Sequence, residues 1–176
     1  MGTLNLDAVL LRFASNARVI AAYFDGMTAE QAATRTRPER WSSHEVLHHL
    51  VYEEREDFKK RVEWTLFHND EGWPPIDPAG WIDERRYPDE PLASTLAAFL
   101  TGREASLSWL GELATDGRLD LTAANVHPLA GSMTVADLIA SWLAHDHLHL
   151  RQLVRNEYER GATLTGVAET PYAGDW

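Results

Sequence analysis

The chain of 176 residues contains no cysteine. A disulfide framework, a Cys-ligated zinc site and a Cys nucleophile are therefore excluded. Any sulfur chemistry would need a thiol supplied by a small molecule. The chain also lacks a signal-peptide pattern and any apolar run near the ~20 residues that span a bilayer. We therefore expect a cytoplasmic protein with no membrane partner.

Basic residues are few, with 16 Lys and Arg against 27 Asp and Glu and a net charge of −11. Phosphate contacts need a basic face, so no nucleic-acid partner is expected. No Gly-rich loop is present that would cradle the phosphates of a nucleotide, flavin or PLP cofactor. A hydrophobic fraction of 44% excludes a disordered chain, and the length predicts a single domain over residues 1–176.

Strand signals are weak, whereas apolar residues recur at helical spacing in four long stretches, which predicts an all-α fold. These stretches cover about residues 5–27, 42–67, 92–113 and 134–161. The second and fourth begin with capping boxes, Ser42 with Glu45 and Thr134 with Asp137. Gly161 is a plausible stop for the last helix, and an irregular tail is expected over residues 162–176.

The connection over residues 68–91 is rich in proline and unusually long for a compact domain. A helix of 20 residues is about 30 Å long, and such a loop can cross that distance. The second and third helices can therefore run parallel, which predicts an up-down-down-up four-helix bundle. An ordinary antiparallel bundle with an irregular loop is the alternative.

Six of the eight histidines fall into two groups, at the start of the second helix and in the middle of the fourth. His145 and His149 are four residues apart and share one flank of their helix, so they can offer two imidazoles to one metal ion. His147 lies on the other flank. A catalytic zinc-like site commonly takes three protein ligands, and the third should come from the second helix. Periodicity does not choose there among His44, His48 and His49.

A resemblance to a known family makes that choice. The run Trp41-Ser-Ser-His-Glu-Val-Leu-His-His-Leu50, followed by Glu54, resembles the second-helix signature of the DinB/YfiT-like superfamily. His145 and His149, followed by Gln152, resemble its fourth-helix motif, and the segment from His127 to Gly131 resembles what precedes that helix. The match extends over essentially the whole chain.

The resemblance implies an up-down-down-up bundle, often dimeric, that binds a divalent metal ion through His49, His145 and His149. Some members of the superfamily are thiol-dependent S-transferases, and others include maleylpyruvate isomerase. Three neutral imidazoles suit zinc, nickel or iron(II). The alternative for the triad is a hydrogen-bonded histidine cluster in a partly buried groove.

Three polar residues beside the triad are candidates for supporting roles, since metal-bound imidazoles usually need hydrogen-bond partners. Gln152 and Asp146 are candidate partners of the ligands. Glu54 is a candidate acid, base or supporting group, with a salt bridge to a nearby Arg or Lys as the alternative.

Three classes of function remain. The first is a metal-dependent transferase or hydrolase acting on a small molecule, with a low-molecular-weight thiol as a possible cosubstrate. The second is a non-catalytic metal-binding module, and the third is a plain interaction bundle. Seven Trp in so short a chain also predict a homodimer, because aromatic residues are enriched in interface cores.

Overall fold

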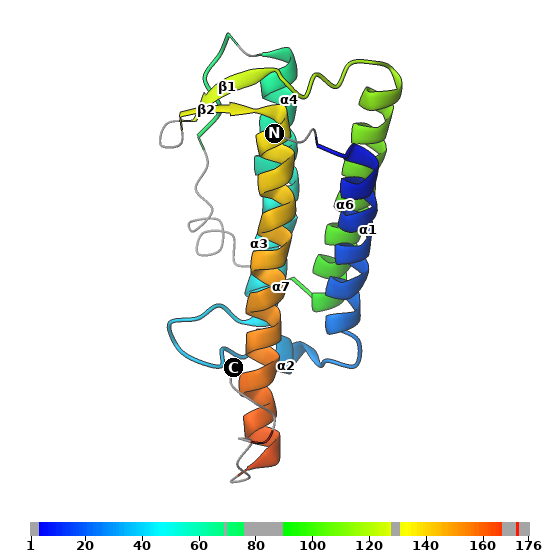
Figure 1. Ribbon diagram of the computed structural model, residues 1–176. Helices are drawn as coiled ribbons and strands as arrows, with labels where there is room; N and C mark the ends of the chain where they lie inside the picture. The colour runs from blue at the N-terminus through cyan, green and yellow to red at the C-terminus, as the bar shows by residue number, and fades with distance from the viewer. Residues whose placement is uncertain (1–3, 69, 76–89, 128–130, 167–171, 173–176) are drawn as a thin grey trace.

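The computed structural model describes residues 4–68, 70–75, 90–127, 131–166 and 172. Its long helices form a four-helix bundle (Figure 1). The second of them is continuous and consists of α3 (Ser43–Tyr52), the π-helical turn η1 (Glu53–Asp57) and α4 (Phe58–Phe67). The other three are α1 (Leu6–Tyr23), α6 (Leu92–Thr115) and α7 (Val135–Thr165).

Two small elements complete the described fold. The short helix α2 (Ala29–Ala33) lies between α1 and α3, and an antiparallel hairpin of β1 (Ala124–His127) and β2 (Gly131–Thr134) precedes α7. The weak strand signals had not predicted this hairpin, but two four-residue strands leave the architecture all-α.

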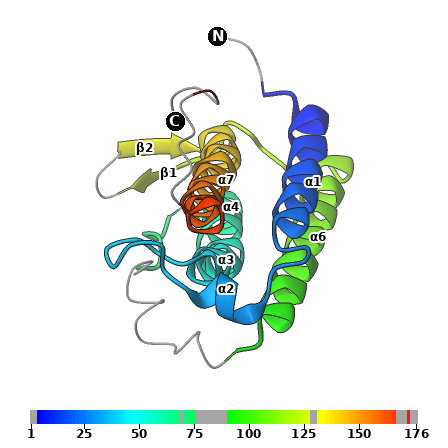
Figure 2. The ribbon, with the colours of Figure 1, turned by 90° about the horizontal axis from the view of Figure 1, so that it is seen from below.

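The direction of the helices confirms the up-down-down-up topology. In Figure 1, α1 and α7 run from the top of the bundle to the bottom, whereas α3–α4 and α6 both run from the bottom to the top. α6 contacts α1 and α3, and α7 contacts α1 and α4, so the helices close into a ring, which Figure 2 shows from below. The second and third long helices are therefore parallel neighbours, as the length of their connection predicted.

Both predicted capping boxes are present. The Ser42 hydroxyl accepts a hydrogen bond from Glu45 N, and Thr134 with Asp137 repeats the arrangement at the start of α7. The predicted stop at Gly161 is wrong, because α7 continues to Thr165 and ends at Gly166, whose φ is 64°. An internal glycine weakens a helix by only about 1 kcal/mol relative to Ala, whereas a positive φ favours glycine directly. Residues 162–165 of the predicted tail are thus helical, and most of the rest lies outside the described residues.

The buried apolar residues form two clusters, one on each side of a polar layer. One cluster includes Phe99 and Leu153, and the other includes Leu110 and Trp142. Between the two clusters, in the sequence of the long helices, lie the buried polar side chains Asn16, Glu53, Glu54, Arg103, Asp146 and His149, and His49 lies one turn before Glu53. No helix among the described residues is long and apolar enough to cross a membrane. The polar layer is where the candidate site lies.

Candidate metal centre

The start of α3 sets the position of the first histidine. Ser42 caps the helix, and its backbone N–H donates to the Glu45 carboxylate at 2.6 Å. Helical geometry from this start directs His49 into the bundle, where it is only 4% exposed. The Trp41 ring packs against the His49 imidazole, with 4.9 Å between the ring centroids. The Trp-Ser start of the helix therefore also forms one wall of the site.

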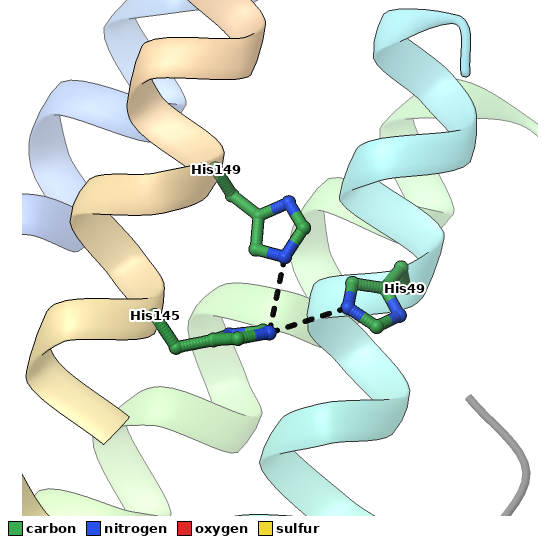
Figure 3. A group of neighbouring side chains, drawn as sticks. All are labelled: His49, His145 and His149. Atoms are coloured by element: carbon green, nitrogen blue, oxygen red, sulfur yellow. Dashed lines mark hydrogen bonds between the residues drawn. The ribbon is translucent and has the colours of Figure 1, made fainter. Parts of the chain in front are cut away.

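The two histidines of α7 meet His49 across the bundle (Figure 3). His145 Nε2 lies 3.0 Å from His149 Nε2 and 3.4 Å from His49 Nε2. One nitrogen from each of the three rings lies within 4.8 Å of the others, an arrangement that could hold a metal ion. The structure thus brings together the three histidines named from the sequence.

Burial keeps these imidazoles neutral. Desolvation, together with the neighbouring histidines, lowers the pKa of His49 to about 3. Desolvation is also the main cause that lowers the pKa of His145 to about 4, and it lowers the pKa of His149. A histidine must be neutral to ligate a metal, so the environment holds all three in the ligating form.

Hydrogen bonding alone does not satisfy this cluster. His149 Nδ1 lies 2.9 Å from Gln152 Oε1, so Nδ1 carries the proton and Nε2 presents a lone pair. A neutral imidazole has one N–H, so His145 Nε2 can make a good hydrogen bond with at most one of its two neighbouring nitrogens. In the other contact, two ring nitrogens face each other without a hydrogen bond between them. A cation bound between the nitrogens would remove this unfavourable contact. The three residues therefore fit a divalent ion.

Glu53 is the site residue that sequence reasoning missed. Its carboxylate lies 3.6 Å from His49 Nε2 and 3.8 Å from His145 Nε2, and its side chain is 5% exposed. Burial, followed by the charge of and a hydrogen bond with Asp57, raises the pKa of Glu53 to about 8. The only sequence signal is its position four residues after His49, one turn along the same face.

Glu54, the carboxylate named from the sequence, faces away from the triad. It forms a buried ion pair with Arg103, whose guanidinium donates to both Glu54 oxygens at 3.0 Å. This is the salt bridge that was the alternative for Glu54. Consecutive residues of a helix point about 100° apart, and Glu53 and Glu54, the first two residues of η1, accordingly have different partners.

Asp146 also belongs to the Arg103 cluster. Arg103 donates to its two oxygens at 2.7 and 2.8 Å, and the Asn16 amide donates to Asp146 Oδ2 at 3.1 Å. Asp146 therefore satisfies buried donors from α1 and α6 and accepts no hydrogen bond from the imidazoles of the triad within the described structure. Gln152, in contrast, contacts His149 as predicted.

The remaining histidines of the two groups lie apart from the triad. His44 Nε2 lies 3.0 Å from Thr95 Oγ1, and His48 Nε2 lies 3.7 Å from Glu90. His147 is on the opposite flank of α7, with Nε2 3.5 Å from the Asn16 amide. The structure thus separates His49 from its neighbours in the sequence, a separation that helical periodicity alone had left open.

Comparison with known proteins agrees with this architecture. The sequence profile of the DinB superfamily matches residues 12–153. The chain belongs to the DinB superfamily. No curated protein matches it.

A solved structure supports the fold. The chain is similar to YfiT from Bacillus subtilis, described as a probable metal-dependent hydrolase with an unusual four-helix bundle topology. The TM-score is 0.78, with 18% sequence identity over 92% of this chain and 90% of that chain. At this identity the likeness establishes the fold and its helix order.

Proposed function

We propose that this DinB-superfamily protein is a metal-dependent hydrolase or transferase that acts on a small molecule. His49, His145 and His149 would hold one divalent ion through their Nε2 atoms. The observation that carries the proposal is the convergence of three buried neutral imidazoles, whose mutual contacts cannot all be hydrogen bonds. Zinc, nickel and iron(II) all suit this donor set.

A divalent ion bound here would supply Lewis acidity, which makes a water or thiol nucleophilic at neutral pH. Residues of the chain would accept the proton, orient the ligands and cover the site. Glu53, which a cation at the triad would keep ionised, is placed to take up the proton that the nucleophile loses, at Oε1 or Oε2. Gln152 fixes the ring of His149, and the rings of Trp41 and Phe58 cover His49 and His145. His145, with its side chain 20% exposed, marks the side on which a substrate can enter.

The nucleophile is either water or an external thiol. Because the sequence has no cysteine, an S-transfer reaction would take its sulfur from a low-molecular-weight cosubstrate. Both reactions use the same ligands and the same proton acceptor, so the site supports them equally.

An assay with a panel of electrophiles, each with and without added thiols, tests the function. We expect turnover by the metal-loaded protein, its loss after chelation and its return when zinc, nickel or iron(II) is added back. Turnover that requires the thiol identifies the transferase, and turnover without it identifies the hydrolase. Activity that survives complete chelation would contradict the proposal.

We also propose that the protein acts as a homodimer in the cytoplasm. On α1, Leu11 and Val19 are 72% and 53% exposed, which adds an apolar surface to the aromatic content noted above. Light scattering should give a particle of twice the 19.8 kDa chain mass at micromolar concentration. A particle of chain mass across that range would contradict the dimer.

A further inference from the structure

A cavity of about 270 Å³ opens on the outer face of α7, beside the triad. Its described lining consists of Arg40, Leu148, Arg151, Gln152, Arg155 and Asn156. Gln152 lines the cavity and also contacts the triad, because its Oε1 atom lies 2.9 Å from His149 Nδ1. The cavity therefore adjoins the candidate metal centre.

The charge of this lining is opposite to that of the protein. The chain has a net charge of −11, yet half of the cavity's described residues are arginines. Arg151 and Arg155 stand four residues apart on α7, a like-charge spacing that disfavours a helix. Within the part of the chain that the structure describes, neither has a carboxylate at ion-pair distance. Two positive charges therefore line this cavity, and no carboxylate of the described residues pairs with either of them.

The third arginine is held in place. Arg40 forms an ion pair with Glu159, which also accepts a hydrogen bond from the Thr36 hydroxyl at 2.7 Å. Arg40 lies directly before Trp41, the residue that packs on His49. The rim of the cavity is thus tied to the same segment that forms a wall of the candidate metal centre.

The distance between the two places suits a small molecule. The arginine-bearing turn of α7 follows His149 by two to six residues, which is roughly 3–9 Å along a helix. Leu148, one residue before His149, also lines the cavity and is 51% exposed. A few carbon atoms would therefore span the distance from a group bound in the cavity to a group at the triad.

We propose that this arginine cavity binds an anionic group of the substrate, a carboxylate or a phosphate. The inference rests on the proposed function and narrows its substrate to a small anion. A guanidinium donates paired hydrogen bonds to either kind of anion. Binding at this remote point would hold the reacting end of the molecule at the triad and lower the entropic cost of reaction.

Paired thiol probes test the inference without knowledge of the natural substrate. The protein is loaded with Co²⁺, whose absorption spectrum reports thiolate binding. The dissociation constants of 3-mercaptopropionate and its neutral amide are then compared at about 0.15 M salt. Because charge-assisted hydrogen bonds are strong, we expect the acid to bind at least about tenfold more tightly.

Two double variants with the same change of net charge assign that preference. Arg151→Gln with Arg155→Gln should reduce the ratio of the two constants to near one. The matched control, Arg12→Gln with Arg18→Gln, changes two exposed arginines of α1 and should keep the wild-type ratio. Competition by added phosphate or acetate then distinguishes the two kinds of anion, and the stronger competitor identifies the preferred group.

The outcomes separate this inference from the proposed function. A wild-type protein that takes up no metal overturns both. A protein that binds metal but favours neither thiol, binds neither, or keeps its preference in the Arg151/Arg155 variant overturns the anion cavity alone. Failure of both phosphate and acetate to compete also contradicts it.

Discussion

Two buried polar clusters lie in the same layer of the bundle, and consecutive residues divide between them. Glu53 faces the triad and His145 belongs to it, whereas the next residue in each case, Glu54 or Asp146, pairs with Arg103. The two clusters therefore share the α3–α4 helix and α7, but they differ in whether their buried polar groups are paired.

The Arg103 cluster contains its own cation and is closed in its hydrogen bonding. One buried guanidinium donates to two buried carboxylates, and Asn16 donates to one of them. In the triad cluster, burial lowers the pKa of three imidazoles and raises that of Glu53, so its groups are buried without a cation of their own. The comparison indicates that the first cluster holds the helices together, whereas the second could hold the metal ion proposed above.

The largest effect is expected when the closed cluster loses its cation. Arg103→Met leaves Glu54 and Asp146 buried and unpaired, which should lower the free energy of unfolding by about 3–5 kcal/mol. Denaturation in urea of the metal-free protein measures this loss. His149→Ala under the same conditions should cost less than about 2 kcal/mol, because it also removes an unfavourable contact between nitrogens. Equal losses would break the distinction between the clusters.

Features that depend on local spacing or on loop length could be predicted from the sequence. The capping boxes at Ser42 and Thr134 depend only on residues three positions apart, so they could be predicted with the helix starts. The parallel second and third helices followed from the length of their connection. Periodicity paired His145 with His149 but needed the family resemblance to choose His49.

The partners of the buried charged residues depend on contacts between helices, which no local sequence pattern encodes. Glu53 lies one turn after His49, but that spacing points to the site only once His49 has been chosen as a ligand, and nothing in the sequence marked the π-turn η1 that starts there. The partnership of Arg103 with Asp146 joins α6 to α7 across 43 positions of sequence. Such pairings depend on how the helices are rotated against one another, which only the packed bundle determines.

The pH dependence of stability sharpens the comparison. The three histidines have lowered pKa values in the folded state, so they reduce stability as the pH falls below about 6.5, where the unfolded chain takes up protons. Glu53 acts in the opposite direction. Its raised pKa, about 8, means that the unfolded chain loses the proton first, so stability falls as the pH rises from about 4.5 to 8.

Above pH 6.5 the histidine effect fades as free histidine loses its remaining protons, and the opposing Glu53 effect should approach about 1.4 kcal/mol per pH unit in metal-free protein. Urea denaturation of wild type and Glu53→Gln at pH 6.5 and 8 measures it. The variant should lack the decline, and so should metal-loaded wild type, because a nearby cation favours the ionised carboxylate. A parallel decline in wild type and variant would assign it to other groups.

The smallest effect concerns the partner of one ligand. Gln152→Ala removes the acceptor that orients His149, and loss of such a partner typically weakens metal binding by about 10- to 100-fold. Competition with a chelator of known affinity measures the change. Glu54→Gln, on the other cluster, should leave the metal affinity within about threefold if the protein remains folded by circular dichroism. An unchanged affinity in Gln152→Ala would show that packing alone orients His149.

The metal content of two histidine variants tests the central claim most directly. Wild-type protein isolated from cells should carry about one divalent first-row ion per chain, measured by elemental analysis. His149→Ala should lose most of that metal, because His145 and His49 alone make an incomplete site. His147→Ala changes the other flank of the same helix and should keep the wild-type content. Equal loss in both variants, or full retention in His149→Ala, would contradict the triad.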